Sequence, residues 1–475
     1  ICGLNIQLPQ KPSDKHILFS DLPKEEQYWR RLDFPKQLRE ILSQEEFDEL
    51  PDLTKAKYSE LIKREWFRRK NGIWFYNNGT ATYLTGEHYM FLQWSNFDFV
   101  PYFTYAQWLW HIHAKACEVD PRCYGQIVGK NRRWGWTSMA ANKITTDTSG
   151  KRRKQSYIIS KTEEDAKDPC FAKAREVFEG WPYFFKVIYH FSGNSIVFDE
   201  PRRRITSKNR VKKKSNGIGS SVTYGSTKNN TFDGKKAFRL MLDEQGKLEK
   251  PVRFSKLWDV HRLCLFDRGK LIGKAYIGTT VEEMEKGGED FKKIYYKSDP
   301  KKRMKNGRTI SGLYKFFISS EYNLVLDKYG MPIIKTPKEE TYDIDGDLVE
   351  FGSRELIEIE LKSRESDIAS VNEYKRVMPV TESDMFRIVG GNSINSERLF
   401  TQLQYNERYQ SSLGIRQGRF RWTGERFNSD VEWIDDPKGR WQICWIPKKE
   451  DRNRKSIKGG IWHPENTWLG ASGID

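Results

Sequence analysis

The sequence predicts an α/β fold with a central, mostly parallel sheet flanked by helices. Short apolar strands at 126–128, 157–159 and 237–243 alternate with helical segments such as 137–144. Alternation of this kind is typical of strand–helix–strand units, in which helices connect parallel strands. A basic loop at 130–135, which follows the first of these strands directly, has the position of a phosphate-binding turn.

The composition narrows the class of protein. The chain has 475 residues and a net charge of +17, and an excess of this size favours a polyanionic partner. Nucleic acid is the first candidate and an anionic membrane surface the second. No run of about 20 apolar residues exists, so we expect no membrane-spanning helix. The six cysteines form no C-x-x-C pair, which predicts free thiols rather than a zinc site.

Two local patterns lie upstream of the predicted sheet. Two β-rich runs in residues 72–84 flank Asn78-Gly79, which predicts a β-hairpin. A helix is expected over residues 104–119, and Ser43 is expected to begin a shorter helix.

The loop after the first strand carries the candidate phosphate-binding residues. A loop of this kind needs a tight turn, a cation for the phosphates and a hydroxyl for Mg²⁺ at the start of a helix. Gly135 supplies the turn and Thr137 the hydroxyl. The match to the standard pattern is incomplete, because Trp136 stands where a lysine is usual and Lys130 stands where a glycine is usual. Lys130 or Arg133 is then the candidate cation. The candidate nucleotide-binding residues of the loop are Lys130, Asn131, Arg132, Arg133, Trp134, Gly135, Trp136, Thr137 and Ser138.

An acidic pair follows the apolar strand at 237–243. Asp243 has the position of a carboxylate that holds Mg²⁺, and Glu244 that of the residue that polarises the attacking water. A rival pair, Asp199-Glu200, follows the apolar run 196–198, but Pro201 and an arginine run come directly after it. The context on both sides favours Asp243-Glu244.

A third candidate element follows the phosphate-binding loop and the acidic pair along the chain. It is the strand 275–277, which leads into Gly278, Thr279 and Thr280. In ATP-driven motors a polar residue beside the acidic strand senses hydrolysis and couples it to movement. The structural alternative is an ordinary strand end with a hydroxyl cap.

These three elements, in this order, resemble the large terminase subunits of tailed phages, most closely those of crAss-like phages, over nearly the whole chain. The resemblance extends to Ser160-Lys161, to residues 225–234 and to Arg376-x-x-Pro379, and departs from the family at Asp384-Met385-Phe386. It implies an ASCE-type P-loop NTPase that binds ATP and Mg²⁺, with Lys130 as the displaced loop lysine and Arg133 as a candidate arginine finger. It also places Tyr105 and Gln107 where this family reads adenine.

The resemblance implies a domain order and a set of partners. We expect an N-terminal extension over 1–100, the ATPase core over 101–380, and a lid and linker over 381–475. A nuclease domain would follow, with Asp475 as its first metal ligand, so nuclease activity is expected only in a longer protein; otherwise Asp475 is an ordinary residue. The expected partners are double-stranded DNA, the portal protein, the procapsid and the small terminase subunit, in a homo-oligomeric ring of five subunits in the host cytoplasm, with no membrane.

Two other functions remain open at this stage. One is a helicase-like nucleic-acid ATPase, although no second P-loop-like core is found. The other is a structural DNA-binding protein with an inactive nucleotide site, which the tryptophan at Trp136 favours and the pair Asp243-Glu244 disfavours. The basic runs at 151–154, 202–214 and 297–308 are either solvated faces or phosphate contacts.

Overall fold

The computed structural model describes residues 1–132, 134–201, 217–228, 231–248, 251–281, 284, 287–387, 401–406, 416–426, 429, 431–443, 455–458 and 461–464. The chain forms two compact units, Ile1–Gly391 and Asn392–Asp475, and each is described by itself. Among the described residues, no helix has the length and apolar character needed to cross a bilayer. The five described cysteines are free thiols, as predicted.

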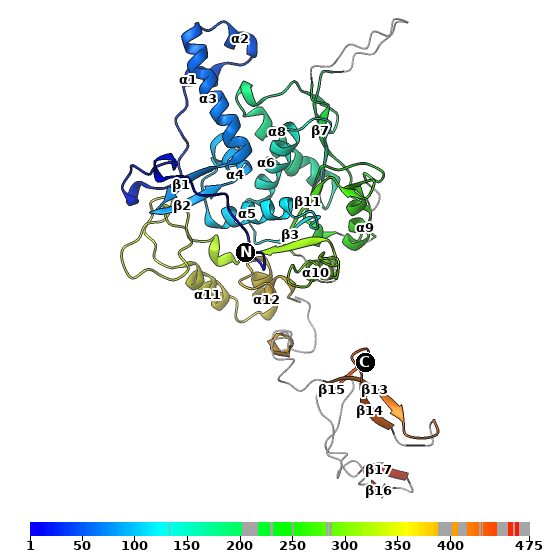
Figure 1. Cartoon of the computed structure of the whole chain (residues 1–475). Coiled ribbons are helices and arrows are strands. Elements are labelled where there is room, and N and C mark those ends of the chain that lie inside the picture. The colour runs from blue at the N-terminus through cyan, green and yellow to red at the C-terminus, as the bar shows by residue number, and fades with distance from the viewer. Residues whose placement is uncertain are drawn as a thin grey trace, which may run out of the picture. The chain divides into compact units, whose positions relative to one another are not determined.

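An eight-stranded sheet forms the centre of the first unit (Figure 1), in the order β12-β3-β11-β8-β4-β7-β6-β5. The first six strands of this order run parallel, and β6 and β5 are antiparallel. The predicted α/β fold with a mostly parallel sheet is therefore confirmed, and β11 lies between β3 and β8. The strands are β3 Gly125–Gly129, β4 Gln155–Ile159, β5 His190–Ser192, β6 Ser195–Phe198, β7 Ser220–Tyr224, β8 Arg239–Asp243, β11 Lys274–Thr279 and β12 Leu313–Phe317.

The central strands are buried on both faces, which explains why β8 and β11 carry apolar residues in succession rather than in alternation with polar ones. Met241 of β8 packs into one hydrophobic core, while its neighbours Leu240 and Leu242 pack into a second core on the other face. The first core is covered by α4, α5, α6 and α8, and the second by α9 and α10 (Figure 1). These helices are α4 Gly86–Trp94, α5 Tyr105–Val119, α6 Trp136–Ser149, α8 Ala172–Glu179, α9 Phe254–Cys264 and α10 Gly288–Tyr296.

The predicted hairpin is confirmed. Strand β1 (Ile73–Asn77) pairs with β2 (Thr80–Leu84) in antiparallel register. Asn78 and Gly79 both have positive φ values, +46° and +75°, as a two-residue hairpin turn of the primed type requires. The predicted helix start at Ser43 is also confirmed, because its hydroxyl accepts a hydrogen bond from the amide of Glu46.

The remaining elements surround this centre or belong to the second unit. In the first unit they are α1 Lys36–Glu40, α2 Gln44–Asp48, α3 Asp52–Asn71, α7 Glu163–Asp165, β9 Phe266–Asp267, β10 Lys270–Leu271, α11 Ser353–Ser363 and α12 Ile368–Val377, with short 3-10 or π turns between some of them. In the second unit β13 Arg416–Trp422 pairs with both β14 Val431–Asp435 and β15 Trp441–Ile443, and β16 Lys455–Lys458 pairs with β17 Ile461–Pro464.

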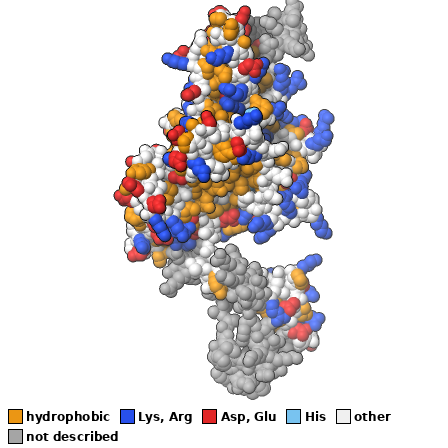
Figure 2. Space-filling view, turned by 60° about the vertical axis from the view of Figure 1, so that its left-hand side comes forward, with side chains coloured by type: hydrophobic (Ala, Val, Ile, Leu, Met, Phe, Trp, Pro, Cys, Tyr) orange, Lys and Arg blue, Asp and Glu red, His pale blue; other side chains and the backbone are white. Residues whose placement is uncertain are grey.

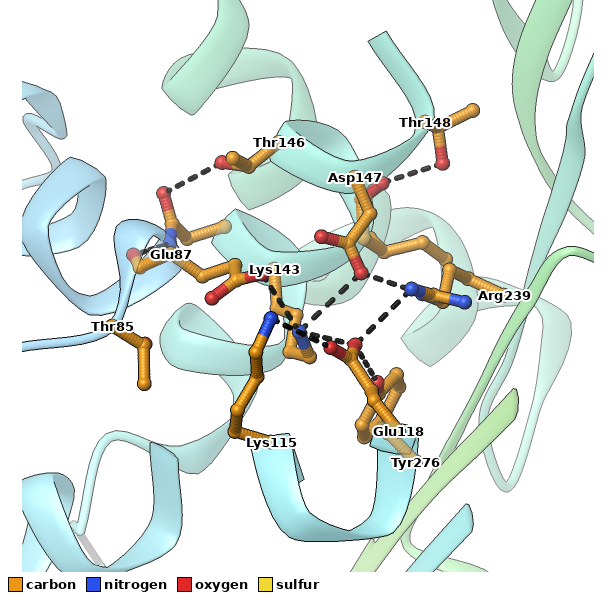
Figure 3. A network of polar contacts seen from close by, with 12 residues as sticks. Thr85, Glu87, Lys115, Glu118, Lys143, Thr146, Asp147, Thr148, Arg239 and Tyr276 are labelled. Carbon is orange, nitrogen blue, oxygen red and sulfur yellow. Dashed lines mark hydrogen bonds and ion pairs between the residues drawn. The ribbon is translucent and has the colours of Figure 1, made fainter. Parts of the chain in front are cut away.

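A buried network of charges ties α6 to the sheet (Figure 3). The ammonium of Lys143 lies 2.7 Å from Glu118, 3.3 Å from Asp147 and 3.5 Å from Glu87. Arg239, at the start of β8, contacts Glu118 at 3.1 Å and also pairs with Asp147. The three carboxylates lie within 4.8 Å of one another, a spacing that suits a metal ion, but Lys143 already provides the cation among them. The network is therefore structural.

Candidate nucleotide-binding site

The loop between β3 and α6 is held against its neighbours by backbone hydrogen bonds. The amide of Lys130 donates to the carbonyl of Thr279 at 2.9 Å, and that of Arg132 donates to Val377 at 3.3 Å. Gly135 has a φ of +79°, a left-handed conformation that glycine adopts without strain, and α6 begins at the next residue. The turn therefore leads directly into a helix whose first amides have no partner within the helix. Arg133, the candidate arginine finger, lies outside the described residues.

Trp136 occupies the place of the usual lysine, and the structure gives the reason. Its indole is buried, with 1% of its surface exposed, and lies directly against Gly278 of β11. A Cβ atom on Gly278 would come within 2.5 Å of the ring, so only glycine fits there. Lys130 lies over the same ring, with its ammonium 4.9 Å from the centroid. Lys130 thus brings a cation to the site while Trp136 fills the space beneath it.

Lys130 and Thr137 converge on the acidic pair at the end of β8. The Lys130 ammonium lies 2.9 Å from Asp243 Oδ1 and 3.2 Å from Glu244 Oε1. The Thr137 hydroxyl donates to Asp243 Oδ2 at 2.9 Å. Lys130 and Thr137 are 113 and 106 residues from Asp243 in the sequence, and the parallel sheet brings them to one point. These are three of the predicted site residues.

The ion pair keeps these groups charged despite their burial. Burial lowers the pKa of Lys130, but Asp243 and Glu244 outweigh that effect and raise this pKa above its ordinary value. Burial likewise raises the pKa of Glu244, but Lys130 and Lys247 outweigh it and hold this pKa below its ordinary value. Glu244 is therefore a carboxylate and Lys130 an ammonium at neutral pH.

Glu244 is held by four groups in a left-handed backbone conformation, with a φ of +51°. Its carboxylate pairs with Lys130 and with Lys247, both at 3.2 Å. The same carboxylate accepts hydrogen bonds from the hydroxyl of Thr279 and the amide of Thr280, each at 3.2 Å. Thr279 also accepts from the amide of Gly246 at 3.1 Å. The two predicted coupling residues therefore contact the predicted catalytic glutamate directly.

An open cleft of about 370 Å³ lies over these groups. It is lined by Lys130, Asn131, Arg132, Trp134, Gly135, Trp136, Thr137, Ser138, Pro169, Lys173, Glu244, Lys247 and Thr280. Lys173 and Lys247 were missed by the sequence reasoning. Lys247 had a local signal, because it stands three residues after Glu244. Lys173 had none, since it reaches the cleft from α8, where it also lies over the rings of Phe97 and Phe99.

Neither Tyr105 nor Gln107 is among the residues that line the cleft. Tyr105 stacks on Tyr322, with ring centroids 6.1 Å apart. The next residue, Asn323, donates to Asn131 of the loop at 3.2 Å, which connects this aromatic pair to the cleft wall. Within the described part of the chain, the buried Gln107 Oε1 has no hydrogen-bond partner. A buried amide of this kind is a candidate for recognition of a base.

The rival acidic pair lies elsewhere. Asp199 and Glu200 follow β6, which is antiparallel and separated from β8 by β7 and β4. They do not line the cleft. Asp475, the candidate nuclease ligand, lies outside the described residues.

The residues of the cleft fit an ATP–Mg²⁺ complex. The amides at the start of α6 and the Lys130 ammonium suit the phosphates, and the adjacent Thr137 hydroxyl and Asp243 carboxylate are oxygen ligands of the kind that Mg²⁺ prefers.

No protein-family model matches this sequence, and no curated protein matches it significantly. Eight chains of solved structures match this chain. They include the large terminase ATPase domain of Thermus phage P74-26, at 13% identity and a TM-score of 0.33, with 49% of this chain and 85% of that chain covered. The large terminase of a thermophilic bacteriophage, in complex with ADP, matches at 14% identity and a TM-score of 0.28, with 45% of each chain covered. The HK97 bacteriophage large terminase matches at 12% identity and a TM-score of 0.35, with 73% of this chain and 65% of that chain covered.

Proposed function

We propose that this chain is the ATPase motor of a phage large terminase, of the crAss-like type, which drives double-stranded DNA into a procapsid. The observation that carries the proposal is the convergence of Lys130 and Thr137 on Asp243, beside Glu244. The terminase resemblance of the sequence supports the same reading, because it assigns the displaced lysine to Lys130.

In this proposal the phosphates of ATP lie at the start of α6, near Lys130. Thr137 and Asp243 would hold Mg²⁺, which neutralises charge on the phosphates when bound. Glu244 orients the attacking water once its carboxylate leaves Lys130 and Lys247. Preorganised amides and a fixed cation stabilise the charge that develops on the transferred group. Tyr105 and Gln107 contact the adenine.

Thr279 and Thr280 connect this site to movement. Both contact the Glu244 carboxylate, so a change at the γ-phosphate that displaces Glu244 also changes their hydrogen bonds. We assign residues 381–475 to the lid that receives this change, residues 1–100 to the extension and 101–380 to the core. Arg133 is assigned as the arginine finger, in cis or toward a neighbouring subunit.

The partners follow from the same proposal. They are double-stranded DNA, the portal protein, the procapsid and the small terminase subunit, with the chain in a ring of five copies in the host cytoplasm. A nuclease domain, with Asp475 as a metal ligand, belongs to the whole terminase.

The alternative of an inactive nucleotide site rested on the missing lysine at Trp136. That residue is a buried packing residue against Gly278, and Lys130 brings the cation instead. The incomplete motif is therefore compatible with hydrolysis.

ATP hydrolysis by the 475-residue chain, with and without linear duplex DNA, tests the proposal. We expect the wild type to turn over ATP, and Glu244→Gln to bind ATP but hydrolyse it at least about 100-fold more slowly. Glu200→Gln makes the same chemical change in the rival pair and should leave turnover intact. An unchanged rate in Glu244→Gln would reject the assigned role, and no ATP binding by the wild type, with portal and DNA added, would reject the motor.

A further inference from the structure

The edge of the sheet opposite the nucleotide cleft is rich in basic side chains. Six strands are parallel, so all their starts lie at one edge and all their ends at the other. The register aligns these starts closely, for example Gly125 beside both Ala275 and Leu313, and Arg239 beside Lys274. The cleft lies at the ends of β3, β8 and β11. The segments that lead into the strands therefore form the opposite edge.

These segments are strongly basic. They contain fifteen Lys and Arg against four Asp and no Glu, over the segments before β3, β4, β8, β11 and β12, which are 120–124, 151–154, 231–238, 266–273 and 297–312. Two of the basic runs noted in the sequence, 151–154 and 297–308, thus belong to one feature of the fold. We call these five segments the basic rim.

Side-chain contacts join the β12, β3 and β11 parts of the rim. Arg308 donates to the hydroxyl of Tyr124 at 2.8 Å, and Tyr124 packs edge-on against Phe266 at 5.1 Å between centroids. Arg122 and Arg303 both pair with Asp120, at 3.0 and 3.7 Å. Three segments that are distant in the sequence therefore lie against one another.

The contacts continue to β8 and β4. Lys236, before β8, pairs with Asp267, before β11, at 2.8 Å. Lys154, before β4, lies over the ring of Phe238, with 5.2 Å between its ammonium and the centroid. The five segments are thus contiguous across the sheet, in the same order as their strands.

Much of the positive charge on the rim faces solvent. Asp120, Asp267 and Asp299 are each engaged in ion pairs, so they add little free negative charge. Ten of the rim's exposed cations make no ion pair to a carboxylate among the described residues. They are Lys151, Arg152, Arg153, Lys235, Arg268, Lys270, Lys297, Lys301, Lys302 and Lys305. Figure 2 shows Lys and Arg side chains along the right-hand border of the first unit.

We propose that the basic rim binds the phosphate backbone of duplex DNA without reading its sequence. Five strands spaced by about 4.8 Å give a row on the order of 19 Å. One DNA strand presents a phosphate about every 3.4 Å, so the row matches about five or six phosphates. Lys and Arg contacts to phosphates position a duplex without specifying bases, as a DNA-translocating motor requires. The choice of DNA as the polyanion rests on the proposed function.

A charge-reversal variant with a matched control tests this proposal. The rim variant carries Arg152→Glu, Lys235→Glu, Lys270→Glu and Lys305→Glu, one exposed residue from each of four segments. The control carries Lys57→Glu, Lys63→Glu, Arg64→Glu and Lys70→Glu, all exposed on α3. Both variants lower the net charge by the same amount. A difference in their DNA affinity therefore shows the effect of where the reversed charges lie. Thermal unfolding checks that both fold.

Affinity for a linear duplex is measured at several salt concentrations, without nucleotide, so the result does not depend on hydrolysis. We expect the rim variant to bind at least about tenfold more weakly than the control, and its salt dependence to fall by up to about 3.6 in log–log slope. An unrelated duplex sequence should give the same affinities.

Three outcomes would overturn the proposal. The first is an equal loss of DNA affinity in the rim variant and the control variant, and the second is a wild type that binds no duplex. The third is a wild type that binds phosphatidylserine vesicles through the rim and does not bind DNA. A wild type that binds DNA through the rim but hydrolyses no ATP would refute the motor and leave the rim assignment standing.

Discussion

The ammonium of Lys130 lies 2.9 Å from Asp243 Oδ1, so the first residue of the loop contacts the carboxylate that ends β8. The usual lysine of such loops precedes the hydroxyl residue directly, at the start of the helix. Here the cation enters from the opposite end of the loop and reaches the same place. The loop therefore has a cation beside the acidic pair, although the lysine that usually precedes the hydroxyl residue is missing.

Replacing Lys130 tests that relationship. Lys130→Ala should weaken ATP binding at least about tenfold, because the only loop lysine is lost. It should also lower the free energy of unfolding by about 3–5 kcal/mol, since Asp243 stays buried beside Glu244 without its cation. Fluorescence titration with an ATP analogue and chemical denaturation measure the two effects. Lys57→Ala, on the exposed surface of α3, is the control, and ATP affinity equal to that of the wild type in Lys130→Ala would contradict the assignment.

Thr279 and Thr280 contact Glu244 in different ways, and this difference yields a second prediction. Thr279 donates through its hydroxyl, whereas Thr280 donates through its backbone amide. Thr279→Val should lower the rate of hydrolysis about 5- to 150-fold, corresponding to about 1–3 kcal/mol for a lost buried partner, with ATP affinity little changed. Thr280→Val keeps the amide, so it should have a much smaller effect. Equal rates for the two variants in a steady-state assay would contradict the proposed coupling.

The buried network around Lys143 predicts a large effect on stability (Figure 3). Lys143→Met removes the cation shared by Glu87, Glu118 and Asp147, and should cost about 3–5 kcal/mol of unfolding free energy. Lys115→Met is the matched change at the edge of the network, where the side chain is 46% exposed and 3.8 Å from Glu118. It should cost less than about 1 kcal/mol. Similar denaturation midpoints for the two variants would show that Lys143 is not the centre of the network.

Buried histidines predict acid sensitivity. Burial lowers the pKa of His88 and of His113 to about 3, from an ordinary value of 6.5, so both are neutral in the folded protein. The unfolded chain takes up protons below about pH 6.5, and stability therefore falls as the pH drops from about 6.5 toward 3. Each such histidine contributes up to about 1.4 kcal/mol per pH unit in that window.

His88 allows this effect to be isolated. It stacks on His111 at 4.3 Å, and neither of its ring nitrogens has a partner among the described residues. His88→Phe should reduce the drop in Tm between about pH 7.5 and pH 5.5. His16→Phe, at an exposed position, removes a histidine without removing a buried one. An equal drop in Tm for His88→Phe and the wild type over this pH range would contradict the role assigned to the buried histidine.

Local patterns in the sequence predicted the elements that depend on local chemistry. The turn Asn78-Gly79 predicted the hairpin because both residues accept positive φ, and the apolar runs predicted the strands because both faces of the sheet are buried. The convergence of Lys130, Thr137 and Asp243 was also predictable in outline, since parallel strands place their ends at one edge.

Contacts that depend on tertiary packing were not predictable. Trp136 departs from the usual pattern, and only its packing against Gly278 explains why the space is filled by a ring. Lys173 reaches the cleft from α8 with no sequence signal nearby. The network of Lys143 with Glu87 and Arg239 joins residues whose spacing in the chain follows no motif. The sequence alone therefore does not distinguish them from ordinary charged residues of the surface.

Displacement of a third DNA strand from a linear duplex tests the central claim, ATP-driven movement along DNA, most directly. The wild-type chain, assembled with portal and procapsid, should release the third strand when ATP is added, and Glu244→Gln should bind ATP and release none. Hydrolysis of ATP without any release, or equal release with and without ATP, would contradict the motor.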